Sequence, residues 1–508
     1  MKLVAKSSLI IAFFFGINKI LGFVRQLFVA RQFQLSYELD AFNAANNIPD
    51  LLAALLSGGA LAIALIPVLT ETLDKQGRKE AWQLFSNVLN LAFIVTGLIS
   101  VILFIVTPFF INNIVVPGFP QEYQQLSIEI MRLNLLAVMI FSISGLFMAG
   151  LQANRHFLFP AIAPAMYNIG QIFGVIILAP ATGYTILGIT LPAFGLGIHG
   201  LVYGVILGAL LHLLIQVPAL IKYRFHWEPK LRLRSAAIRK VLVILAPRIA
   251  TMFFIQLFYI VRDNLASGMG EGAVTALNLG WFIMQVPEAM IGTALGIAIL
   301  PSISSAIMGG REPEFIKSIN AALRALFAIT IPIAVLLSIG LFPLVELAFG
   351  YEPADTQRVV LASQVYLAGL VGHALLEIAS RAFYAKQKPI IPLYAAILNA
   401  LSYFLLALVL SNWFGFIGIA ISNTVVFTAQ SIIMLIILNR QHKGIFAVKK
   451  TIIKVFSWTA GSALLVYLFL SQAAFLPAFL QSAIAVTASI CLCWWLMRHE
   501  ISPILDVQ

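Results

Sequence analysis

The chain has 508 residues, of which 61% are hydrophobic and only 10% charged, and its mean hydropathy is +0.98. Soluble domains carry about 25% charged residues, so this composition excludes a soluble protein and predicts an all-α, polytopic membrane protein. The formal net charge of +12 would suggest a nucleic-acid partner in a soluble protein, but the positions of the charges give another explanation.

Apolar runs of about 20 residues, the length that crosses the hydrocarbon core of a bilayer, recur along the whole chain. The first follows a signal-like start, "MKLVAKSSLIIAFFFG", but no small-x-small cleavage site follows, so we expect it to be retained. Fourteen transmembrane helices are predicted, at residues 8–29, 41–68, 84–111, 125–151, 158–180, 195–221, 240–265, 273–301, 320–348, 358–384, 389–411, 413–438, 452–471 and 476–497.

The basic residues alternate between the loops. Most of the 32 Lys and Arg lie at the termini or in every second loop, namely 70–83, 152–157, 222–239, 302–319, 385–388 and 439–454. Intervening loops such as "NNIVVPGFPQE" and "SQAAFLPAF" carry almost none. Because cytoplasmic loops are rich in Lys and Arg, both termini are predicted to be cytoplasmic. The basic excess is then a topology signal that requires no nucleic-acid partner.

The two halves of the chain resemble each other. "ALAIALIPVLTE" (60–71) aligns with "ALGIAILPSISS" (294–305), and "GFVRQ" (22–26) aligns with "YIVRD" (259–263). "NNIPD" aligns with "MQVPE", and "GLQANRHFLFP" with "AFYAKQKPIIP", in the same order along the chain. The pattern predicts two six-helix lobes related by a parallel internal repeat, the organisation of alternating-access transporters. The predicted domains are an N-lobe (1–225), a C-lobe with a basic cytoplasmic linker (226–445) and two added C-terminal helices (446–508).

The first predicted helix carries a polar stripe. At about 100° per residue, five of its residues share an arc of about 120°: Asn18, Lys19, Gly22, Arg25 and Gln26. Arg25 alone could snorkel from the helix end to the headgroups. Lys19 lies deeper, and an ionisable residue inside a membrane by default faces a cavity or a partner, so we expect this stripe to line a cavity.

Charged residues outside the stripe are also considered. Arg262 is the repeat equivalent of Arg25 and is expected to face the same cavity from the other lobe, with Asp263 as a local charge partner. Asp40 is either a site residue or only an interfacial charge at the start of the second helix. Asp50 and Glu288 follow prolines at equivalent positions, and either pair with cations or line the cavity.

A cavity lined by Lys19, Arg25 and Arg262 favours an anion, and arginine in particular suits phosphate. A large amphiphile with an anionic head group fits this arrangement, because its head can enter the cavity while its lipid tail stays in the bilayer. The candidate substrate-binding residues are therefore Lys19, Arg25, Arg262, Asn18, Gln26 and Asp40.

Several segments resemble one known family. "KILGFVRQLFVARQF", "DAFNAANNIPDLLAALLSGGALAIALIPVLTE", "LQANRHFLFPAIAPAMYNIGQI" and "VPEAMIGTALGIAILPSIS" are similar to the MurJ (MviN) lipid II flippases of the MOP superfamily. The resemblance implies fourteen helices, cavity cations at Lys19 and Arg25, and an important acidic residue at Asp40. Two further family arginines are absent, since Ala53 and Phe282 occupy those positions.

The resemblance implies a flippase that moves lipid II, an undecaprenyl-pyrophosphate-linked peptidoglycan precursor, to the outer leaflet of the bacterial cytoplasmic membrane. The alternative is a flippase for another lipid-linked oligosaccharide. No GxxxxGK[ST] or HExxH motif is present, so we expect neither an enzyme nor a bound cofactor or metal. The expected partners are the lipid-linked anionic substrate and membrane lipids, with cell-wall synthesis proteins as possible partners of a monomer.

Overall fold

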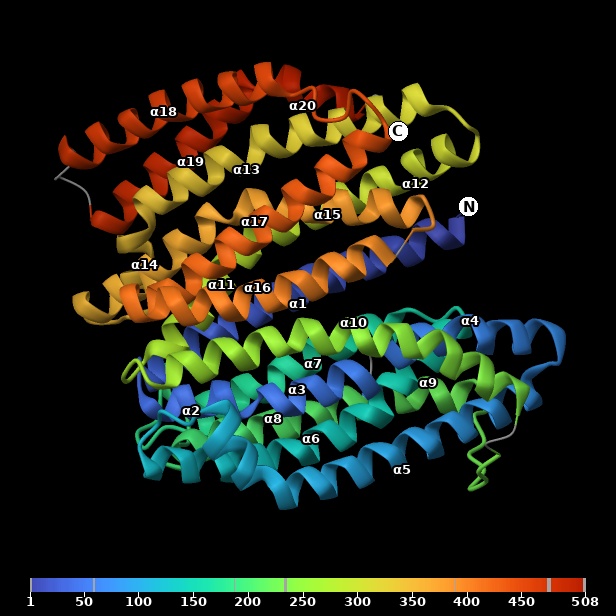
Figure 1. Cartoon of the computed structure of the whole chain (residues 1–508). Helices are drawn as coiled ribbons and strands as arrows, with labels where there is room; N and C mark the ends of the chain where they lie inside the picture. The colour runs from blue at the N-terminus through green and yellow to red at the C-terminus, as the bar shows by residue number, and fades with distance from the viewer. Residues whose placement is uncertain are drawn as a thin grey trace. The chain divides into compact units, whose positions relative to one another are not determined.

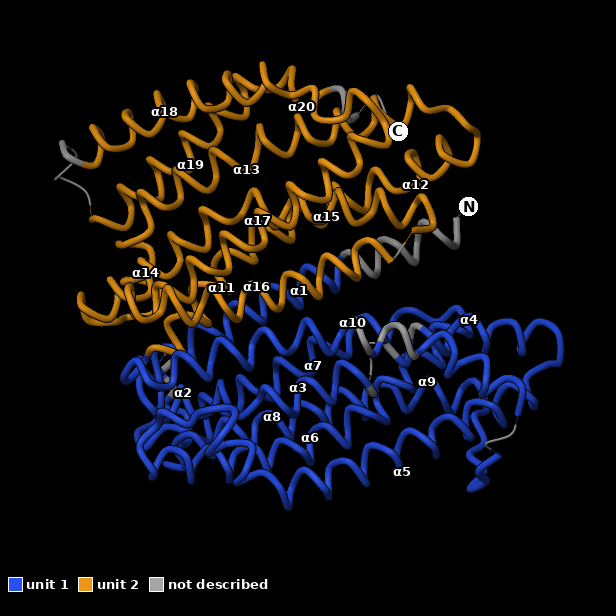
Figure 2. Tube along the Cα trace, viewed as in Figure 1, with its two compact units in different colours: residues 1–272 blue, residues 273–508 orange. Residues whose placement is uncertain are grey.

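The computed structural model describes residues 2–57, 60–186, 188–232, 235–388, 390–472 and 477–505. Helices make up almost all of this part of the chain (Figure 1), which confirms the all-α class. The contacts divide it into two compact units, residues Met1–Gly272 and Ala273–Gln508 (Figure 2).

Unit 1 contains ten α-helices, three π-helical segments and one two-stranded hairpin among its described residues. The α-helices are α1 (Lys2–Phe33), α2 (Tyr37–Ala45), α3 (Asn47–Leu52), α4 (Ala60–Lys75), α5 (Arg78–Phe110), α6 (Gln121–Ala153), α7 (Leu158–Phe173), α8 (Gly197–Leu214), α9 (Val217–Lys222) and α10 (Ala236–Ser267). The π-helical segments and the antiparallel strands are η1 (Ala53–Ser57), η2 (Ile111–Val115), η3 (Gly174–Leu178), β1 (Thr185–Ile186) and β2 (Ile189–Thr190).

Unit 2 is built around α13, the longest helix of the described chain. Its elements are α11 (Ala273–Glu288), η4 (Ala289–Thr293), α12 (Ala294–Met308), α13 (Glu312–Phe349), α14 (Pro353–Ala368), α15 (Leu370–Ala385), α16 (Ile390–Phe414), α17 (Phe416–Gln441), α18 (Lys449–Gln472), α19 (Ala478–Leu496) and α20 (Arg498–Leu505). Helices α12, α14, α15, α18 and α19 all pack on α13, so α18 and α19 extend the core of this unit.

Twelve helical segments of the described residues are long and apolar enough to cross a membrane, which makes the chain a multi-span membrane protein. The predicted number of fourteen stays a prediction. The predicted span 240–265 lies inside the single helix α10. The predicted span 41–68 is divided into α2, α3, η1 and α4, and its residues 58 and 59 lie outside the described part. Pro49 contributes to this break because proline has no N–H to donate to the preceding turn.

Close packing of α7 on α8 sets the position of the helix that faces the candidate site. A Cβ added at Gly170 would lie 2.3 Å from the Cα of Gly208, and one added at Gly174 would lie 2.7 Å from the Cα of Gly204. Small residues of this kind let helix backbones touch, which is a common way of packing helices in membranes. The opposite side of α7 packs on α1.

The contact division and the repeat do not place their boundary at the same residue. Helix α10 follows the predicted lobe boundary at residue 225, yet it packs on α3 and α4 and belongs to unit 1. The contacts show which helices are packed together, whereas the predicted repeat shows which segments are similar in sequence. The predicted domain limits therefore stay a prediction.

Candidate functional site

The polar stripe of α1 meets a polar pair on α7. Asn18 accepts a hydrogen bond of 2.8 Å from the side-chain amide of Asn168, which is 6% exposed. An amide–amide hydrogen bond between two membrane helices satisfies both groups where water is scarce. Asn18 is thereby fixed against α7, directly before Lys19 and about two turns before Arg25.

Arg25 lies further along the same face of α1 and is half-buried. Its guanidinium is within electrostatic range of the Tyr167 hydroxyl on α7 and of the Asp50 carboxylate on α3. No ion pair within 4 Å joins Arg25 to Asp50, and Asp50 is exposed. The predicted electrostatic link of Asp50 to a cation is therefore present without a direct ion pair.

The other stripe residues differ in exposure. Lys19 is exposed, and its ammonium lies 5.3 Å from the ring centroid of Phe15 on the same helix. Gln26 is half-buried. At Gly22, an added Cβ would come no closer than 3.9 Å to Asn168, an ordinary contact, so α1 and α7 do not need glycine there.

Asp40 is fully buried, which rules out an interfacial, water-exposed charge at this position. Its Oδ2 accepts a 2.7 Å hydrogen bond from the backbone N–H of Gly272, and the N–H of Tyr37 donates to Glu271 at 3.1 Å. Ser36 caps the helix by accepting from the N–H of Leu39. Asp40 thus anchors the start of α2 to the segment that follows α10, and its predicted role in substrate binding stays a prediction.

Arg262 belongs to a second polar cluster, which is buried inside unit 1. Its Nε donates to Oδ1 of Asp263 at 2.7 Å, and both side chains are at most 4% exposed. The other carboxylate oxygen of Asp263 accepts a 2.8 Å hydrogen bond from Asn47 on α3. The guanidinium also lies over the ring of Tyr259, 5.2 Å from its centroid. Asp263 is therefore the charge partner of Arg262, as predicted.

The six predicted site residues thus fall into three places of unit 1. Asn18, Lys19, Arg25 and Gln26 lie on α1, with the first and third facing α7. Arg262 lies in the buried ion pair of α10, and Asp40 lies at the start of α2. The sequence reasoning missed Tyr167 and Asn168, although two polar residues in the apolar run Leu158–Phe173 are a signal for a polar neighbour.

The site offers hydrogen-bond donors and one half-buried cation, which suit a polar or anionic group. Among the described residues, no group of three or more His, Cys, Asp or Glu could hold a metal ion.

Solved structures share the fold of this chain. A structure of the lipid II flippase MurJ in an inward closed conformation aligns with a TM-score of 0.78 at 20% identity, covering 97% of this chain and 99% of that one. An inward-facing multidrug resistance MATE family transporter of the MOP superfamily aligns with a TM-score of 0.67 at 18% identity, covering 85% and 96%. This chain belongs to the class of multi-span helical proteins that share this fold.

Sequence comparison identifies the family within this class. The family model described as lipid II flippase MurJ matches residues 29–499, and this chain belongs to that family. The lipid II flippase MurJ of Burkholderia cenocepacia is 29% identical over 393 residues, covering 75% of this chain and 73% of its own. The probable lipid II flippase MurJ of Buchnera aphidicola is 27% identical over 420 residues, covering 80% and 78%.

Proposed function

We propose that this protein translocates lipid II from the inner to the outer leaflet of the bacterial cytoplasmic membrane by alternating access. The family match over residues 29–499 carries this conclusion. The polar α1–α7 contact supports it, because a half-buried arginine beside hydrogen-bonding amides suits a pyrophosphate head group. The chain acts as a transporter, and its substrate is lipid-linked and anionic.

We assign head-group binding to Asn18, Lys19, Arg25 and Gln26. The hydrogen bond from Asn168 to Asn18 and the nearby Asp50 and Tyr167 hold this face of α1 in a polar environment. Arg262 and Asp40 contribute through their contacts with α3 and with the segment after α10. The exposed Lys19 meets the phosphates first, and Arg25 binds them nearer the outer end of the helix.

The proposed topology has fourteen spans, two repeats and both termini in the cytoplasm. The alternating basic loops support this orientation. The repeat gains support from the π-helical segments: η1 and η4 start at Ala53 and Ala289, an offset of 236 residues that lies within the spacing of the aligned segments. The protein works as a monomer among membrane lipids, next to the enzymes of cell-wall synthesis.

A second candidate cargo is another lipid-linked oligosaccharide. Ala53 and Phe282 stand where the family resemblance implies arginines, so this chain has fewer cations with which to bind a pyrophosphate. A cargo with a single phosphate, or with a different glycan, would need fewer of them.

Complementation tests both candidates. Bacteria depleted of their own lipid II flippase would receive the wild type, Arg25→Ala, Lys19→Ala/Arg25→Ala or Arg31→Ala, and an added probe would report outer-leaflet lipid II. We expect rescue by the wild type and by Arg31→Ala, an exposed cation on the same helix, and loss with both Arg25 variants. Well-expressed wild type that restores no outer-leaflet lipid II would refute this cargo and favour the second candidate. Full rescue by the double variant would show that Lys19 and Arg25 of α1 do not bind the head group.

A further inference from the structure

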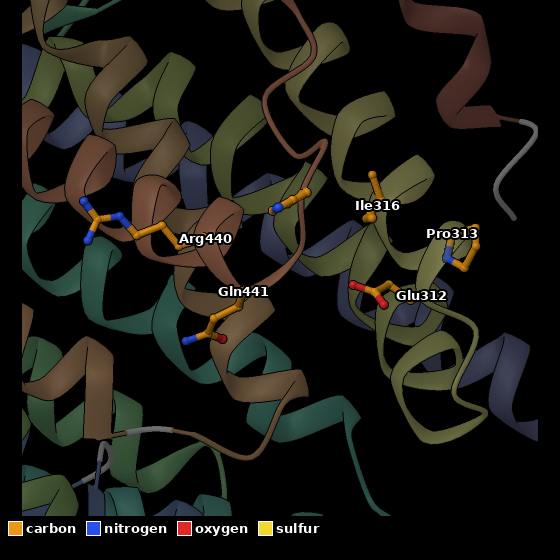
Figure 3. A pocket seen from close by; sticks show the side chains of 6 residues that line it. Glu312, Pro313, Ile316, Arg440 and Gln441 are labelled. Atoms are coloured by element: carbon orange, nitrogen blue, oxygen red, sulfur yellow. The ribbon is translucent and has the colours of Figure 1, made fainter.

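A pocket of about 640 Å³ lies in unit 2, between the start of α13 and the end of α17 (Figure 3). It is lined by Glu312, Pro313, Ile316, Arg440, Gln441 and Lys443. All of these residues are distant in sequence from the α1–α7 cluster, and nothing in the proposed transport uses them.

The single carboxylate of the lining is already engaged. The Nδ1 atom of His442 lies 2.6 Å from Glu312, and the ammonium of Lys386 lies 2.8 Å from the Nε2 atom of the same ring. Because an ammonium can only donate, Nε2 accepts and Nδ1 carries the proton that is donated to Glu312. Lys386 also donates to Gln441. Glu314, the other acid in the first turn of α13, pairs with Arg311 at 2.8 Å.

Two cations of the lining have no such partner. Neither Arg440 nor Lys443 makes an ion pair among the residues that the structure describes. Figure 3 shows the Arg440 side chain extending away from Glu312. The pocket and its immediate neighbours therefore hold three cations, Lys386, Arg440 and Lys443, against the one carboxylate of Glu312, which favours an anionic ligand.

The wall that carries Lys443 is held in place by one side chain of α13. The amide of Asn320 donates to the carbonyl of Gly444 at 2.8 Å, and its oxygen accepts from the N–H groups of Phe446 and Ala447 at 3.0 and 3.1 Å. Gly444 and Phe446 have φ values of +103° and +76°. These contacts fix a backbone turn that the sequence alone would not favour, and the pocket is formed in advance of any ligand.

An apolar stripe on α17 leads to the pocket. Its residues are exposed and, at about 100° per residue, fall within an arc of about 100° that ends at Arg440: Val425, Ala429, Ile432, Ile433 and Ile436. Exposed aliphatic side chains on a membrane-spanning helix are suited to contact acyl chains, and an arginine at the end of such a helix lies at headgroup depth. The stripe and the pocket together match one molecule with an apolar tail and an anionic head.

We propose that this pocket binds the phosphate head group of an anionic phospholipid of the bilayer, with Arg440 and Lys443 as its charge partners and its acyl chains along the stripe of α17. The ligand is a resident lipid and not the transported cargo, so the inference stands apart from the proposed function. The same phosphate chemistry could be supplied by a soluble anion, which the apolar stripe does not favour.

The test uses the full-length protein in nanodiscs of phosphatidylcholine with a minor fraction of phosphatidylglycerol. Native mass spectrometry would count the phosphatidylglycerol molecules retained by the wild type, by Arg440→Gln/Lys443→Gln and by Lys449→Gln/Lys450→Gln. The last variant removes the same charge from two exposed lysines outside the pocket. We expect the pocket variant to bind phosphatidylglycerol about five-fold more weakly for each charge removed, and the control to match the wild type.

Three outcomes would overturn the proposal. Equal retention by the wild type and the pocket variant would show that the pocket does not bind the lipid. An equal loss in the control variant would show that retention reflects only general charge attraction. Displacement of phosphatidylglycerol by inorganic phosphate would show a soluble-anion site that makes no use of the stripe. Outer-leaflet lipid II, measured separately in cells, reports the transport function and does not enter this comparison.

Discussion

The segments 46–71 and 284–305 align in the predicted repeat, and each contains a π-helical segment that follows an α-helix. In unit 1, η1 follows α3 directly and α4 begins at Ala60, with residues 58 and 59 outside the described part. In unit 2, α11, η4 and α12 form one continuous candidate span, Ala273–Met308. Both segments carry a proline followed by an acid, and η1 begins three residues after Asp50 whereas η4 begins directly after Glu288. The two segments therefore share the order of their helical elements and differ in the helices that surround them.

The two surroundings differ in chemistry. In unit 1, α10 holds the segment by polar bonds: Asn47 donates to Asp263, and Lys240 pairs with Glu71. In unit 2, α15 holds it by close packing, because a Cβ added at Gly292 would lie 2.9 Å from the Cα of Ala374. The bonds from α10 form a polar clamp that contacts side chains at separate points. The packing at Gly292 instead brings two helix backbones together.

The strongest test of the polar clamp is Asp263→Ala. This change leaves the Arg262 guanidinium buried without its carboxylate, and breaking a buried pair on one side costs about 3–5 kcal/mol. We expect a large loss of thermal stability for the purified protein in detergent, followed by intrinsic fluorescence. Asp74→Ala, which removes an exposed acid at the end of α4, is the matched control. A melting temperature equal to that of the control would show that the clamp does not hold α3.

The corresponding test in unit 2 is Gly292→Ala. The new methyl group would lie 2.9 Å from both the Ala374 Cα and a Glu288 carboxylate oxygen, and overpacking of this kind costs about 1–3 kcal/mol. Gly461→Ala, at a position where an added Cβ meets nothing within 4 Å, should instead leave stability unchanged or raise it slightly. If both variants have the same melting temperature, the α11–α15 side of unit 2 is packed more loosely than its backbone distances indicate.

Sequence patterns could predict the helical class, most spans and the polar stripe because each depends on local periodicity and hydropathy. They could not predict that Asp263, the partner of Arg262, is hydrogen-bonded to Asn47, since that contact joins residues 216 positions apart. The break between α2 and α3 was also missed, although Asn46, Asn47 and Pro49 interrupt the apolar run there. Asn168 could have been included, because an amide in an apolar helix needs a partner.

A functional comparison of the two segments uses their acids. Asp50 is exposed and within electrostatic range of Arg25, whereas Glu288 is half-buried and accepts a weak hydrogen bond of 3.5 Å from Thr293. We expect Asp50→Asn to lower outer-leaflet lipid II several-fold in the complementation assay, because it alters the charge balance around Arg25. Glu288→Gln should have the smaller effect. The reverse order would place the functional acid in unit 2.

The smallest expected effect concerns the Glu71–Lys240 contact, which lies outside the spans. Hydrogen bonds and charge attraction from Lys240 and Lys75 lower the pKa of Glu71 from 4.5 to about 2. A depressed carboxylate pKa stabilises the folded state above the unfolded value, and this contribution is lost as the pH falls from about 4.5 towards 2. We expect the melting temperature of the wild type to fall slightly more over that interval than that of Glu71→Gln. Since the pair is exposed, added salt should reduce the difference. Identical pH profiles at low salt would mean that α4 is held to α10 by apolar packing, with no contribution from this surface pair.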